Sequence, residues 1–161
     1  MAPQLVPYLI FLHVMGAILA FGPTFAFSFM GIMASREPQH ANFSARQSEL
    51  ISNRLVYPFA ILQGITGLAI IWAASYPVMS SPWLLIGIVL YLIAVIYGLT
   101  VQRAALHRLI ELSSTPPPPG TPPGPPPPEL MAVAKRVRQG GMLLGTLIVI
   151  IVFLMVVKPG S

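Results

Sequence analysis

Three long stretches of the chain carry no charged side chain: residues 1–35, 55–102 and 139–157. A helix needs about 20 apolar residues to cross the roughly 30 Å hydrocarbon core of a bilayer. The first and last stretches therefore predict one membrane span each. The middle stretch is long enough for two spans, and a turn with two prolines and three serines at residues 75–82 divides it. The sequence therefore predicts four spans.

The composition supports a membrane protein and excludes several other classes. Only 8% of the 161 residues are charged, whereas 55% are hydrophobic. An ordinary soluble domain has roughly 25% charged residues. A soluble enzyme, a disordered protein and a nucleic-acid binder with a basic surface are therefore excluded. The chain has no cysteine, so disulfides, thiolate nucleophiles and cysteine-ligated metals are excluded too.

We expect an all-α fold in a single domain, an antiparallel bundle with spans near residues 5–34, 55–75, 82–106 and 139–157. A backbone in lipid must satisfy its own hydrogen bonds, and helices do so. The pair Ser81-Pro82 is a good helix start. The pattern at residues 44–47 resembles a capping box and predicts that the second helix begins near Ser44. Helices two to four are therefore expected to extend beyond the bilayer on one side.

A proline tract separates the third and fourth spans at residues 116–128, where ten of thirteen residues are proline. Such a segment favours extended polyproline II. We interpret it as a linker loop between the two extended helix ends. Docking of a proline-binding partner is the alternative.

The basic residues predict the orientation of the bundle. Basic side chains are enriched in cytoplasmic loops of membrane proteins. We therefore expect a protein integral to the bacterial cytoplasmic membrane, with both termini outside and both charged loops in the cytoplasm. Only Lys158 falls on the outer side, against eight basic residues on the inner side: Arg36, Arg46, Arg54, Arg103, Arg108, Lys135, Arg136 and Arg138.

His13 is the one ionisable residue well inside a predicted span, and such residues are candidates for function. At 1.5 Å per residue, His13, Thr66, Tyr91 and Thr146 all lie about 12–17 Å from the outer membrane surface. With Gln63 beside Thr66, these residues are expected to form one polar layer.

Small residues recur beside this layer at helical spacing. Small residues let membrane helices approach closely. Each span is therefore expected to present a packing stripe to its neighbours, with glycines at Gly16, Gly64, Gly67, Gly87, Gly98, Gly141 and Gly145.

Two interpretations of His13 are open at this stage. In the first, His13 donates or accepts a hydrogen bond with Tyr91 or a threonine and stabilises the bundle. In the second, His13 is an axial ligand of haem b, and the small residues make room for the macrocycle. The sequence predicts no other cofactor, no metal site and no catalytic set.

Two segments resemble a known bacterial family: residues 11–22 (FLHVMGAILAFG) and residues 57–67 (YPFAILQGITG). They are similar to predicted small four-helix integral membrane proteins of unknown function. That family is distantly similar to copper-resistance D type proteins and to the membrane haem-binding protoporphyrinogen oxidase. The resemblance implies a histidine early in the first helix, matched by His13. The oxidase type also relies on a lysine in its third helix, where Arg103 is the nearest basic residue here.

Three functions remain open from the sequence. The first is a non-enzymatic accessory subunit of a respiratory or photosynthetic membrane complex. The second is a haem b protein in electron transfer or porphyrin chemistry, and the third is a small transporter. The expected partners are the lipid bilayer and another membrane protein or a second copy of the chain, with no nucleic acid.

Overall fold

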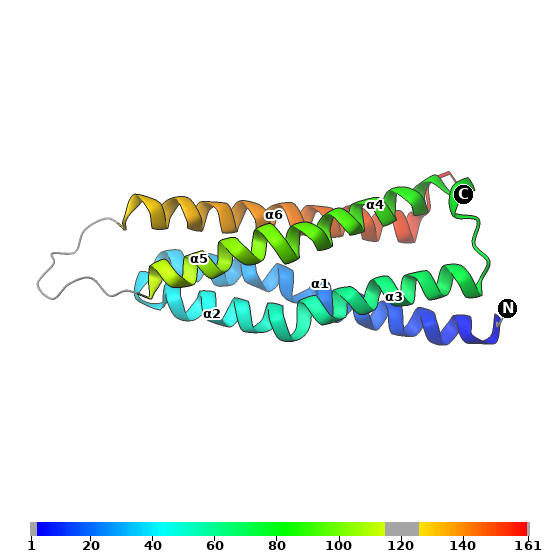
Figure 1. The fold of residues 1–161 in the computed structure, drawn as a ribbon, viewed down its shortest axis with the longest axis horizontal. Coiled ribbons are helices and arrows are strands. Elements are labelled where there is room, and N and C mark those ends of the chain that lie inside the picture. Colours follow the sequence, from blue (N-terminus) through cyan, green and yellow to red (C-terminus); the bar gives the residue numbers. More distant parts are fainter. Residues whose placement is uncertain (1–2, 115–125, 161) are drawn as a thin grey trace, which may run out of the picture.

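The computed structural model describes residues 3–114 and 126–160, and these residues are helical apart from short connections (Figure 1). The α-helices are α1 (Val6–Arg36), α2 (Ala41–Ile51), α3 (Tyr57–Ala73), α4 (Pro82–Tyr97), α5 (Arg103–Ser113) and α6 (Pro128–Val157). The 3-10 turns are η1 (Pro3–Leu5), η2 (Pro38–His40) and η4 (Val78–Ser80), and the π-helical segments are η3 (Ser52–Val56) and η5 (Gly98–Gln102).

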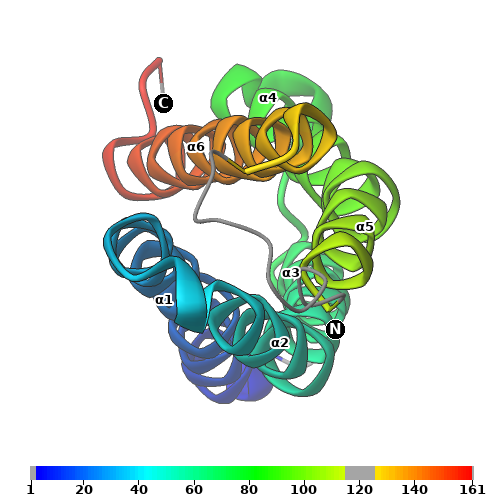
Figure 2. The ribbon, with the colours of Figure 1, turned by 90° about the vertical axis from the view of Figure 1, so that its left-hand side faces the viewer.

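These elements form four long helices that are apolar enough to cross a membrane: Val6–Arg36, Pro38–Ala73, Pro82–Ser113 and Pro128–Val157. They run antiparallel, so the N- and C-terminal ends lie together at one end of the bundle (Figure 1). Viewed from the opposite end, the helices follow one another in a ring, and α6 closes it beside α1 (Figure 2). The predicted all-α four-helix membrane fold is confirmed.

The extended ends of helices two to four are also confirmed, since α2, α5 and the first third of α6 are helical. The start of the second helix was predicted too late, because the helix is already formed at Ala41. Ser44 is not its cap: its hydroxyl donates to the carbonyl of Met30 in α1 at 3.3 Å. The predicted start at Pro82 is correct. Most of the proline tract, residues 116–125, lies outside the described residues.

Two π-helical turns were not foreseen from the sequence. They lie in helices two and three, where each passes from its apolar part to its charged part. The Gly98 carbonyl, in the second of them, accepts the N–H of Arg103 and also the hydroxyl of Tyr57 at 3.3 Å. The hydroxyl thus joins the two helices at the level of both π turns.

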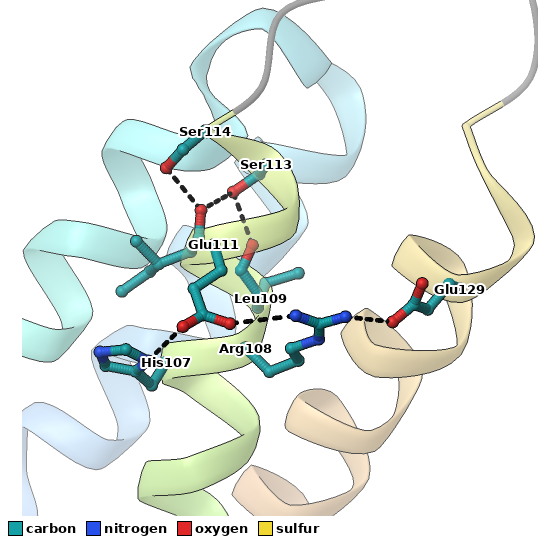
Figure 3. Close-up of polar contacts among 8 residues, drawn as sticks. His107, Arg108, Leu109, Glu111, Ser113, Ser114 and Glu129 are labelled. Atoms are coloured by element: carbon teal, nitrogen blue, oxygen red, sulfur yellow. Dashed lines mark hydrogen bonds and ion pairs between the residues drawn. The ribbon is translucent and has the colours of Figure 1, made fainter.

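The charged end of the bundle is held by polar contacts between helices (Figure 3). Arg108 of α5 donates to Glu111 at 3.1 Å and to Glu129 of α6 at 2.7 Å. These two carboxylates raise the pKa of the Arg108 guanidinium above its usual value. On the other side of α5, the Asn42 amide of α2 donates to the Ile110 carbonyl at 3.1 Å. The helical extensions therefore form a bundle of their own.

The opposite end is closed by a small apolar core around Trp83, Leu84 and Leu154. The Trp83 ring packs edge-on against Tyr76, with 5.8 Å between ring centroids, and the Lys158 ammonium lies 5.5 Å from the Trp83 centroid. Large apolar side chains elsewhere point outward, for example Tyr8 and Phe29, which are both 71% exposed. Such a surface suits a lipid environment.

The separation of charges leads to a topology prediction. Because the chain has no cysteine, single cysteines at Gln39 and Ser80, both exposed and at opposite ends, give unambiguous labels. A membrane-impermeant thiol reagent added to whole cells is expected to label Ser80→Cys and not Gln39→Cys. Labelling of Gln39→Cys alone would reverse the orientation. Permeabilised cells are the control, in which both positions should react.

Candidate functional site

His13 lies at the contact between α1 and α3 and is bonded through both ring nitrogens. Its Nδ1 is 3.0 Å from Oγ1 of Thr66, and its Nε2 is 2.9 Å from Nε2 of Gln63. Gln63 and Thr66 are buried, whereas His13 is half-buried. The structure therefore brings Gln63 and Thr66, two of the residues expected in the polar layer, together with His13 in a three-residue cluster.

The hydrogen-bond geometry identifies the tautomer of His13. The Thr66 hydroxyl has one proton, which it donates to the backbone carbonyls of Leu62 at 2.9 Å and Gln63 at 3.1 Å. Its oxygen must therefore accept from His13, which requires a proton on Nδ1. The remaining lone pair, on Nε2, then accepts from the Gln63 amide. His13 is therefore a neutral imidazole with both nitrogens in use.

Glycines make this contact close. A Cβ added to Gly67 would lie 3.2 Å from Cε1 of His13, so the ring packs against the backbone of α3. A Cβ added to Gly16 would lie 2.9 Å from Oε1 of Gln63. The small residues beside His13 therefore give room to the imidazole and the Gln63 amide.

This arrangement does not fit haem ligation. An axial histidine coordinates iron through a nitrogen lone pair, and the one lone pair of this tautomer, on Nε2, accepts the Gln63 amide proton. The space that the sequence offered to a macrocycle is occupied by the contact with Gly16 and Gly67.

Tyr91 stabilises a different contact, between α3 and α4. Its hydroxyl donates to the carbonyl of Ala60 at 2.7 Å, and its ring lies against Gly64. Of the two hydrogen-bond partners considered for His13, a threonine is therefore observed and Tyr91 is not. Tyr91 also lines a small apolar cavity of about 70 Å³ between α1, α3, α4 and α6.

The structure does not bring Thr146 into the cluster. Its side chain is exposed, and its hydroxyl donates to the carbonyl of Met142 in its own helix at 3.0 Å. Depth along the bundle was estimated from the sequence, but the direction around α6 was not.

Some of the predicted packing glycines contact another helix and others do not. Gly87 contacts the Met155 methyl group, whereas no described atom lies within 4 Å of a Cβ built on Gly98, Gly141 or Gly145.

A second polar contact was missed by the sequence reasoning. Gln102 of η5 donates through Nε2 to the Val137 carbonyl of α6 at 3.1 Å. Its amide oxygen lies against Gly140, which is buried and also faces the Tyr97 hydroxyl. The signals that could have found it are Gln102, at the end of one charge-free stretch, and Gly140, near the start of the next.

The His13 cluster predicts a modest loss of stability on mutation. Replacing His13 with alanine removes two side-chain hydrogen bonds, which average about 0.6 kcal/mol each in membrane helices, so about 1 kcal/mol is expected. His13→Gln should retain part of this. Unfolding in mixed micelles measures the difference, with exposed His40→Ala as the control. A Soret absorption band in the wild type that disappears in His13→Ala would contradict this account of the site.

A matched pair of glycine substitutions tests which helix packs against a neighbour through its glycines, α3 at Gly64 or α6 at Gly145. In Gly64→Ala the new methyl group would lie 2.6 Å from the Tyr91 hydroxyl, so the ring must shift and its bond to Ala60 is lost. Overpacking of this kind costs about 1–3 kcal/mol. Gly145→Ala meets no described atom within 4 Å and should change the free energy of unfolding by less than about 0.5 kcal/mol. Equal losses of unfolding free energy at the two positions would show that Gly64 and Gly145 are packed equally closely, which would contradict this account.

Comparison with known proteins agrees with the family that residues 11–22 and 57–67 suggested. No curated protein and no solved structure matches the chain, so the likeness to copper-resistance D and haem oxidase types stays a prediction. A family model described as a predicted integral membrane protein matches residues 7–159. This range includes all four long helices except Val6, and it includes the His13 cluster. The chain belongs to the DUF2269 family of predicted integral membrane proteins.

Proposed function

We propose that this protein is a non-enzymatic membrane subunit that associates with another membrane protein or with a second copy of itself. The observation that carries the proposal is the bonding of His13. The only ionisable side chain deep in the predicted spans is held between α1 and α3 through both ring nitrogens. A general base, a proton carrier or a metal ligand needs a nitrogen that can take up a proton or a ligand. His13 is instead a structural residue.

The surface of α6 supports association with a partner. Gly141 and Gly145 have the four-residue spacing that brings membrane helices together. Among the described residues they have no close neighbour on their Cβ side. Gly16, Gly64 and Gly67 contact side chains within the chain. Gly141 and Gly145 are half-buried and have room beside them, and we infer that a partner fills it. A helix of a partner is the occupant that this spacing favours.

We further propose that the charged end of the bundle faces the cytoplasm and that the chain resides in the bacterial cytoplasmic membrane. The eight basic residues of the inner loops support this orientation. A respiratory or photosynthetic complex is the assembly we favour for the partner, because such complexes contain small accessory subunits without cofactors of their own.

Association through α6 can be tested with a bulky side chain at the open glycines. The protein is extracted from native membranes in a mild detergent, and its mass is measured by native gel electrophoresis and light scattering. The wild type is expected to migrate as a complex of defined size. The double variant Gly141→Leu, Gly145→Leu should migrate as the monomer, because leucine prevents close helix approach.

The matched controls are Met142→Leu and Phe153→Leu, since both side chains are more than half exposed and lie roughly a quarter-turn around α6 from Gly141 and Gly145. These changes should leave the complex intact. If the glycine variant keeps the mass of the wild-type complex while remaining folded, α6 is not the contact surface. If the wild type itself is a monomer, the subunit proposal is wrong.

A further inference from the structure

A groove on the outer surface of the bundle separates α5 from α6 at the charged end of the membrane part. It has a volume of about 340 Å³. Its floor is apolar, with Val101, Ala104 and Val133, and two arginines border it. A groove with an apolar floor and a cationic border matches a molecule with apolar and anionic parts.

The charges along this groove are ordered. Arg108 pairs with Glu129, and the Gln102 amide donates to the Val137 carbonyl. These two contacts show which residues of the third long helix lie beside which residues of α6. By this register Arg136 is level with Gln102, whereas Arg108 lies roughly 9 Å farther from the membrane part. The two carboxylates that neutralise Arg108 lie beyond it (Figure 3). Among the described residues no carboxylate pairs with Arg136, so the membrane-proximal half of the groove carries its positive charge.

Exposed apolar side chains lead from the groove toward the apolar part of the bundle. Thr100, in its wall, lies one helical turn from Ile96 and two turns from Ile93. Ile96 is 62% exposed and Ile93 is 50% exposed. An acyl chain that enters from the groove would therefore meet apolar side chains on α4, while Arg136 stands at the level where headgroups begin.

We propose that this groove binds an anionic phospholipid, with the headgroup phosphate at Arg136 and an acyl chain along Val101 and Ile96. Guanidinium groups bind phosphate through paired, charge-assisted hydrogen bonds, and basic pockets between helices at the membrane surface bind anionic headgroups. The carboxylates at Arg108 close the far end of the groove to a second phosphate. This site is independent of the partner surface on α6 glycines.

Lipid binding can be measured by native mass spectrometry of the full chain released from detergent with phosphatidylglycerol or phosphatidylcholine. The wild type should bind phosphatidylglycerol more tightly. Because Arg136→Gln removes the charge-assisted bond to the phosphate, it should weaken this binding about tenfold or more. Ala104→Trp, at an exposed position of the floor, should have a similar effect by filling the groove.

Lys135→Gln is the matched control. Lys135 is the neighbouring residue with the same charge, but it does not line the groove. Its replacement should change the affinity by less than about twofold if one site binds the lipid, whereas a diffuse surface charge would make both substitutions equivalent. Equal losses in Lys135→Gln and Arg136→Gln, or equal affinity for the two lipids, would overturn the proposal. Displacement of the lipid by excess inorganic phosphate would show a phosphate site instead and would overturn it as well. Circular dichroism of each variant confirms that the helices are retained.

Discussion

The close approach of α1 and α3 is the interaction on which the centre of this bundle depends. Two glycines, Gly16 and Gly67, remove the side chains that would hold the helices apart, and His13, Gln63 and Thr66 bond across the gap. Lipid gives no hydrophobic drive to helix association, so packing and hydrogen bonds must supply it. The hydrogen bonds therefore depend on the glycines, because the side chains reach each other only where the two backbones are close.

The two ends of the bundle are stabilised by different interactions, apolar packing at one end and polar contacts at the other. At the end with the termini, Trp83, Leu84 and Leu154 form an apolar core. At the other end, α2, α5 and the start of α6 extend past the apolar stretch and are joined by Asn42 and Arg108. Water is available to side chains there, so charges can be used without the cost of burying them in hydrocarbon. The π turns lie where the apolar part of each helix meets its charged part.

Much of this arrangement could be predicted from the sequence, since charge-free stretches determine the number of helices and helical rise determines depth. The depth of Thr66 was estimated on that basis, and the structure brings Thr66 and Gln63 into hydrogen-bond contact with His13. Direction around a helix is harder, because membrane helices expose apolar side chains on every lipid-facing side, and α1 has almost no polar face to orient it. Thr146 was therefore assigned to the polar layer although it is exposed. The π turns were beyond prediction, because a shift of one hydrogen bond leaves no compositional trace.

Glycine has a second role here besides allowing close approach. Among the described side chains, the buried polar atoms without a conventional hydrogen-bond partner are the amide oxygens of Gln63 and Gln102. Each of them lies where a glycine would carry its Cβ, Gly16 in one case and Gly140 in the other. In glycine a second Cα–H points along that direction, and Cα–H groups are weak donors to oxygen at helix contacts. Both glutamines therefore use the amide N–H₂ for a strong bond and turn the oxygen toward a glycine, which leaves room for a buried amide where two helix backbones meet.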